Sequence, residues 1–266
     1  MPVDGTGVSM ASEIFEESDR VRVALTSRVR RKRYSHLNAG RGSTWWAPRA
    51  IGWWIGILFA VGATCFALGA LPGYASAVGG EADAITFFAG SLWFTSAAFL
   101  QYLEVVNVDQ DPPRANFRQR FRLLTFEPRR IDWWSTLVQF VGTLFFNATT
   151  FYALSLSLSV SQLDRLVWAP DAFGSVCFLV ASGLAWFEVC RAFACWRLHS
   201  LSWRITALNL VGSAAFGVSA VALFVVPTTG LSRNITLVNL GTFVGALCFF
   251  VGAVLLLPER TQSDSD

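Results

Sequence analysis

Residues 133–146 read WWSTLVQFVGTLFF, and the spacing inside this stretch recurs twice more along the chain. Trp133 stands nine residues before Gly142, and Phe146 follows the glycine by four. The same spacing is found in two other sets: Trp53, Gly62 and Phe66; and Trp203, Gly212 and Phe216. Three copies at one spacing indicate an internal repeat.

A second phrase alternates with the first. In it a glycine is followed at +4 by a phenylalanine and at +14 by a glutamate. Its three copies are Gly90, Phe94 and Glu104; Gly174, Phe178 and Glu188; and Gly245, Phe249 and Glu259. Both phrases lie in long apolar runs, so the alternation predicts three tandem two-helix hairpins.

The composition predicts an all-α membrane protein. Of the 266 residues, 53% are hydrophobic and 15% are charged, whereas an ordinary soluble domain is about 25% charged. About 20 apolar residues in a helix cross the hydrocarbon core of a bilayer. Six transmembrane helices are expected, near 50–71, 84–106, 131–155, 171–193, 203–226 and 235–257. A membrane barrel would need short alternating segments instead. Four residues stand where helices are expected to begin and are predicted N-caps: Asp83, Asp132, Asp171 and Asn234.

The distribution of lysine and arginine predicts the orientation. Nineteen of these residues fall in the N-terminal tail, in the connections that follow the second and fourth helices, or after the sixth helix. Only Arg165 and Arg233 fall on the other side. Because cytoplasmic loops carry the excess of positive charge, both termini are expected in the cytoplasm.

The chain divides into a polar tail, a membrane domain and a short polar end. The N-terminal tail covers residues 1–44, and the C-terminal tail covers residues 259–266. The six-helix domain between them covers residues 45–258, and its three repeats lie at about 50–106, 131–193 and 203–258. The first tail holds a basic cluster that could contact anionic lipid: Arg28, Arg30, Arg31, Lys32 and Arg33. The alternative is a topology signal in a solvated tail. No nucleic-acid recognition module is present.

The repeat glycines are expected to face neighbouring helices near the middle of the bilayer, because only small residues let two backbones approach closely there. They are Gly62, Gly90, Gly142, Gly174, Gly212 and Gly245. Each repeat tryptophan is expected at the cytoplasmic start of its helix, where indole rings favour the head-group layer.

Three hairpins of one orientation imply a pseudo-threefold axis along the membrane normal. On this arrangement Glu104, Glu188 and Glu259 form a loose carboxylate ring at the cytoplasmic mouth, of the kind that attracts cations in channels. The alternative is that each glutamate pairs with a nearby arginine. Two carboxamides, Gln139 and Asn209, each lie three residues before a repeat glycine. They either form hydrogen bonds between helices or provide a polar lining for a solute.

No residue pattern predicts catalysis, a metal site or a cofactor. The sequence has no glycine-rich phosphate loop, no H-E-x-x-H and no nucleophile elbow. Of the five cysteines, Cys65, Cys177 and Cys248 follow a repeat glycine by three residues and are interpreted as small packing residues. The chain is therefore not expected to be an enzyme.

Several phrases resemble the YrhK-like domain of bacterial membrane proteins, a two-helix unit with an early tryptophan and G-[ST]-x-x-F in its helices. They are residues 53–62, 90–94, 142–147 and 174–178. The resemblance covers about 50–258 as three diverged copies, and it implies a bacterial inner-membrane location but no activity. Helix 5 departs from it with Arg204 in place of a second tryptophan, and Ala63 and Ala246 replace Ser or Thr.

The leading functional hypothesis is a structural or accessory membrane component. The alternative is a transporter or channel for a small solute or ion, with a path along the pseudo-threefold axis. A dry axis filled with phenylalanine would favour the first, whereas a hydrated cavity that reaches Gln139 and Asn209 would favour the second. A membrane enzyme is a distant third.

Overall fold

The computed structural model describes residues 45–107, 122–155, 157–226 and 228–259. This part of the chain is almost entirely helical. Its long helices are α2 (Ile51–Gly69), α4 (Gly80–Asn107), α5 (Ile131–Ala153), α7 (Ala169–Cys190), α8 (Leu201–Leu223) and α9 (Ile235–Glu259). The short elements are α3 (Tyr74–Val78), α6 (Val160–Gln162), the π-helix η2 (Leu163–Trp168), and the antiparallel pair β1 (Val225–Val226) and β2 (Leu231–Ser232).

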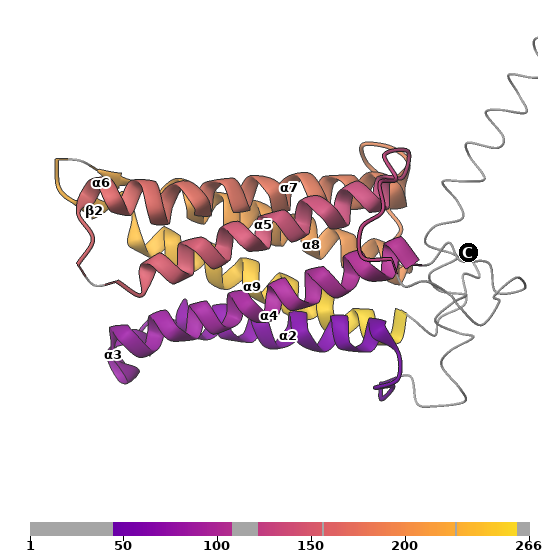
Figure 1. The fold of residues 1–266 in the computed structure, drawn as a ribbon, viewed down its shortest axis with the longest axis horizontal. Coiled ribbons are helices and arrows are strands. Elements are labelled where there is room, and N and C mark those ends of the chain that lie inside the picture. The colour runs from indigo at the N-terminus through magenta and orange to yellow at the C-terminus, as the bar shows by residue number, and fades with distance from the viewer. Residues whose placement is uncertain (1–44, 108–121, 156, 227, 260–266) are drawn as a thin grey trace, which may run out of the picture.

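The long helices lie side by side along the long axis of the molecule (Figure 1). Each packs against the next in the order α2, α4, α5, α7, α8 and α9, and α9 packs back against α2. The helices therefore form a closed ring built from three hairpins. The elements α3, α6 and β2 are all at the same end of the bundle, with α3 on the side opposite to α6 and β2 (Figure 1).

Five helical segments of the described chain are long and apolar enough to cross a membrane. They are Ile51–Gly69, Gly80–Asn107, Val160–Cys190, Leu201–Leu223 and Ile235–Glu259. Helix α5 is not among them, because its 23 residues include Asp132, Gln139, Asn147 and several serines and threonines. It nevertheless lies in the ring between α4 and α7.

Three of the four predicted N-caps are wrong. Asp83 and Asp171 lie inside α4 and α7, which begin earlier than expected. The α7 segment starts at Val160, where Ser159 forms a capping box with Gln162. Asn234 does cap α9, since its Oδ1 accepts the N–H of Leu237 at 3.0 Å. Asp132 is not the N-cap of α5 either, because the helix begins at Ile131; its Oδ1 accepts the N–H of Trp133 at 3.0 Å within the first turn.

The repeat glycines lie where the two helices of each hairpin touch. A Cβ on Gly62 would stand 2.5 Å from the Phe94 ring and 2.9 Å from the carbonyl oxygen of Gly90. A Cβ on Gly142 would stand 2.9 Å from that of Cys177, and one on Gly245 would stand 3.0 Å from the carbonyl oxygen of Gly212. Any side chain at these positions would push the helices apart. The absence of side chains therefore sets the close approach of each pair.

Six phenylalanines occupy the axis of the ring at the level of these glycines. Phe66, Phe146 and Phe216 have ring centroids 5.9–6.4 Å apart. Phe94, Phe178 and Phe249 form a second set at 5.5–6.3 Å. The two sets contact each other within every hairpin at 5.2–5.7 Å, and all six side chains are buried. We call these six residues the phenylalanine cluster.

The tryptophan that begins each copy of the first phrase makes the same bond in all three. Trp53, Trp133 and Trp203 each donate their indole N–H to the carbonyl eight residues earlier, at 2.8–2.9 Å. Each indole also packs on the side chain seven residues earlier, which is always aromatic: Trp46, Phe126 and Trp196. The bond therefore fixes how the chain enters α2, α5 and α8.

Candidate functional site

A cavity of about 150 Å³ with a mixed polar and apolar lining opens inside the ring at the end where α2, α5 and α8 begin. All three predicted ring glutamates line it, one from each of α4, α7 and α9, and so do Gln139 and Asn209. Its other polar lining residues are Gln101, Asp132, Ser135, Thr136, Ser182 and Thr206. We call this cavity the vestibule. It has room for several water molecules.

The phenylalanine cluster borders the inner end of the vestibule. Phe249, a member of the cluster, lines the cavity together with Phe59, and the Phe59 ring lies 5.3 Å from that of Phe94. Because the aromatic rings are in contact with one another, the axis is apolar and packed at this depth. The vestibule therefore ends where the cluster begins.

The hydroxyl groups of the vestibule are already bonded within the protein. Ser135 donates to the carbonyl oxygen of Ala181 at 2.9 Å, and the hydroxyl groups of Ser182 and Ser213 lie 2.7 Å apart. The carboxamides differ, because Gln101, Gln139 and Asn209 make no side-chain hydrogen bond with any described residue. They are half-buried. These carboxamides are thus the groups available to water or to a solute.

The vestibule is polar on one side and apolar on the other. At the position three before the repeat glycine, α5 has Gln139 and α8 has Asn209, whereas α2 has Phe59. Helix α9 adds Ala253 and Leu256 to the apolar side. The lining is therefore not threefold symmetric, although the ring of helices around it is built from three similar hairpins.

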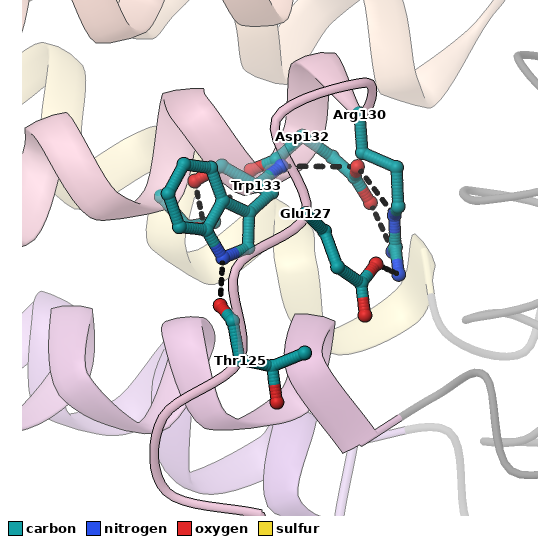
Figure 2. A network of polar contacts seen from close by, with 6 residues as sticks. Thr125, Glu127, Arg130, Asp132 and Trp133 are labelled. Carbon is teal, nitrogen blue, oxygen red and sulfur yellow. Dashed lines mark hydrogen bonds and ion pairs between the residues drawn. The ribbon is translucent and has the colours of Figure 1, made fainter.

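An ion-pair network holds one wall of the vestibule (Figure 2). Arg130 donates to both oxygens of Asp132, at 3.1 Å from Nε and 2.8 Å from Nη2. Its Nη1 lies 2.7 Å from the Glu127 carboxylate. Asp132 is 3% exposed, so the paired guanidinium compensates a carboxylate that has little contact with water.

A second carboxylate of the vestibule is held by a neighbouring helix. Glu259 at the end of α9 is buried and accepts a hydrogen bond from the hydroxyl of Ser202 in α8. Ser202 and Asp132 occupy the same place, one residue before the repeat tryptophan. Asp132 lines the vestibule itself, whereas Ser202 contacts one of its lining carboxylates.

The lining carries four carboxylates, from Glu104, Asp132, Glu188 and Glu259, and among the described residues no arginine or lysine lines it. Carboxylate and carboxamide oxygens suit a cation or a cationic solute. Within the described ranges no three His, Cys, Asp or Glu side chains are grouped closely enough to hold a metal ion.

Three features of this end were not expected from the sequence. Gln101 and Asp132 belong to the lining, and a disulfide joins Cys190 and Cys195, whose Cα atoms are 5.5 Å apart. The register of the repeat could have placed Asp132, because it lies seven residues before Gln139 and hence on the same helix face. The basic cluster Arg28, Arg30, Arg31, Lys32 and Arg33 lies outside the described residues.

No family model, curated protein or solved structure matches the chain. The resemblance to the YrhK-like domain therefore rests on the spacing of its residues alone.

Proposed function

We propose that this protein is a multi-pass membrane protein that acts as a structural or accessory component and has no open path across the bilayer. The proposal includes six crossings in three YrhK-like hairpins, with both termini in the cytoplasm of a bacterium. The observation that carries it is the phenylalanine cluster, in which six buried rings fill the axis of the helix ring. A packed apolar axis supports a scaffold more than a conduit, because a permanent ion path needs polar or hydrated walls.

Helix α5 is less apolar than the other long helices, and its place in the ring supports a sixth crossing. The polar side chains of a transmembrane helix face the interior of the bundle. In α5, Asp132, Thr136 and Gln139 face the vestibule, and Thr143 is fully buried. The lipid-facing surface of α5 carries apolar residues such as Trp134, Val141 and Leu144.

One observation supports placing the vestibule end in the cytoplasm, and the disulfide at that end has to be reconciled with it. The arginine-rich connections support a cytoplasmic location for the vestibule end. The Cys190–Cys195 disulfide joins the last residue of α7 to the connection that leads to α8, at that same end, and the cytoplasm keeps most thiols reduced. On the proposed orientation these two cysteines are thiols in the cell and form the bond only after oxidation.

The vestibule favours a second candidate function, transport of a small solute or ion. Three carboxamides without described partners and four carboxylates line one cavity, which is a suitable entrance for a cation. Transport would require the phenylalanine cluster to separate during each cycle. The first candidate is preferred because it needs no such movement.

A flux measurement separates the two candidates. Purified protein is reconstituted into liposomes with a potassium gradient and a potential-sensitive dye. We expect a leak equal to that of protein-free liposomes, because the packed rings present no polar route. The triple variant Glu104→Gln/Glu188→Gln/Glu259→Gln should behave in the same way. Valinomycin, added at the end, checks that the vesicles are sealed.

Cation flux through the wild-type protein that disappears in the triple variant would overturn the accessory function and assign transport through the vestibule. Flux of equal size in both proteins would also contradict a closed axis, and it would remove the glutamates from the path.

A further inference from the structure

An apolar groove of about 810 Å³ lies between α7 and α8, in the half of the bundle away from the vestibule. Its walls carry Val176, Val218 and Val221, which are 48–63% exposed and so face outward from the bundle. Its floor is made of small residues, Ala214 and Gly217 among them. The groove therefore opens where the hydrocarbon of a membrane would lie.

The groove exists because the third repeat carries small residues. Relative to the repeat glycine, Ala214, Gly217 and Ala220 of α8 correspond to Leu144, Asn147 and Thr150 of α5. Between α4 and α5 two of these larger side chains, Asn147 and Thr150, contact α4. Asn147 accepts a hydrogen bond from Thr95 at 3.1 Å, and Thr150 lies 2.9 Å from Ser91. Between α7 and α8 the corresponding positions leave the groove open.

One end of the groove is basic. Arg233 and Asn234 line it, and Arg233 is the only charged residue among the described lining residues. Its guanidinium is exposed and makes no hydrogen bond or ion pair with a described residue. Asn234 caps α9 at the same place, so the positive end of the α9 dipole adds to the charge.

We propose that this groove binds one phospholipid with a net negative head group. An acyl chain lies along the valine walls, and the phosphate sits against Arg233 and the first turn of α9. Trp168 lines the same end of the groove and donates its indole N–H to the carbonyl oxygen of Ala220 at 3.0 Å. Indole rings favour the head-group layer, which matches the position given to the phosphate. This inference rests on the membrane location in the proposed function.

The test is native mass spectrometry of the full chain extracted from membranes in mild detergent and titrated with phosphatidylglycerol or phosphatidylcholine. The wild type should retain one phosphatidylglycerol and bind it in preference to phosphatidylcholine. Arg233→Gln should weaken phosphatidylglycerol binding about fivefold, the effect of one basic residue near an anionic head group. Arg165→Gln is the matched control, because Arg165 lies on the same side of the protein but does not line the groove.

A second variant fills the groove without changing the charge. Ala214→Leu/Gly217→Leu should abolish retention of the lipid. The double variant should still fold, because a Cβ on Gly217 would meet only the end of the Leu179 side chain, at 3.3 Å. Val211→Leu adds bulk to α8 at a 55% exposed site outside the groove, and it should bind as the wild type does.

Several results would overturn the groove proposal. One is lipid binding by Arg233→Gln or by the filled variant that equals binding by the wild type, and another is a loss of binding of the same size in the two control variants. A third is that inorganic phosphate alone reproduces the difference between the wild type and Arg233→Gln. A fourth is a dimer that the wild type forms and the filled variant does not. The last result would assign the groove to a second copy of the chain. A wild-type protein found only in the soluble fraction would instead contradict the membrane location, so the two failures are distinguishable.

Discussion

Gly62→Val should destabilise the protein by about 3 kcal/mol, a value at the upper end of the usual cost of overpacking a core. The Cβ alone would lie 2.5 Å from the Phe94 ring and 2.9 Å from the carbonyl oxygen of Gly90. The ring cannot move away freely, because it contacts Phe66, Phe178 and Phe249. The backbones of α2 and α4 must therefore separate. The free energy of unfolding in mixed micelles, titrated with denaturing detergent, measures the loss.

Gly183→Ala is the matched control for this prediction. Gly183 lies inside α7, and apart from its chain neighbours and the adjacent backbone of its own helix no atom stands within 4 Å of its Cβ position. Alanine there should leave stability unchanged or raise it by up to about 1 kcal/mol, because glycine is a poor residue in a helix interior. Equal destabilisation by the two substitutions would mean that the tight contact at Gly62 does not set the packing of the hairpin.

Phe178→Ala should cost about 3–5 kcal/mol, the usual range for removal of a buried phenylalanine. Phe178 is 1% exposed, and its ring lies 5.2 Å from that of Phe146 and 5.5 Å from that of Phe249. Its removal leaves a void on the axis that side chains from three hairpins border. The same detergent titration measures the change in unfolding free energy.

Phe173→Ala provides the comparison on the same helix. Phe173 is 60% exposed, so in the micelle its ring contacts detergent more than protein. We expect a loss of less than about 1 kcal/mol, as for most surface substitutions. A large loss at Phe173 together with a small one at Phe178 would place the core of the protein elsewhere and remove the basis for a closed axis.

The spacing of residues was enough to anticipate much of the helical arrangement. Nine residues of helix separate Trp53 from Gly62, which puts the indole at the start of the helix and the glycine deep inside the bundle. A phenylalanine at +4 shares the glycine face, and the structure brings Phe66 to the axis. Periodicity works here because each helix is long and regular.

The conformation of the segments that connect the long helices could not be anticipated in the same way. The helices expected near 131–155 and 171–193 leave residues 156–170 as a connecting loop. The structure instead continues α7 back to Val160 through a π-helix, where the carboxylate of Asp164 accepts the N–H of Val225 at 3.3 Å. This contact joins residues 61 positions apart, so helical periodicity contains no information about it.

The vestibule was anticipated in part. The +14 spacing led to Glu104, Glu188 and Glu259, and all three line one cavity. Its apolar side was not expected, because it depends on Phe59 and Leu256, which occupy positions where other repeats have different residues. The bond between Ser202 and Glu259 likewise requires the ends of α8 and α9 to be placed in three dimensions.

The three hairpins close into one ring, in which the first and last long helices are neighbours. Disulfide cross-linking in native membranes tests this most directly, with the pair Gly56→Cys/Leu257→Cys in a chain whose five native cysteines are replaced by alanine. A Cβ on Gly56 would lie 3.5 Å from the Cγ of Leu257, so we expect rapid cross-linking on mild oxidation. Gly56→Cys/Gly183→Cys joins α2 to α7, which is opposite in the ring, and should remain uncrosslinked. Failure of the first pair, or equal cross-linking of both pairs, would contradict the closed ring.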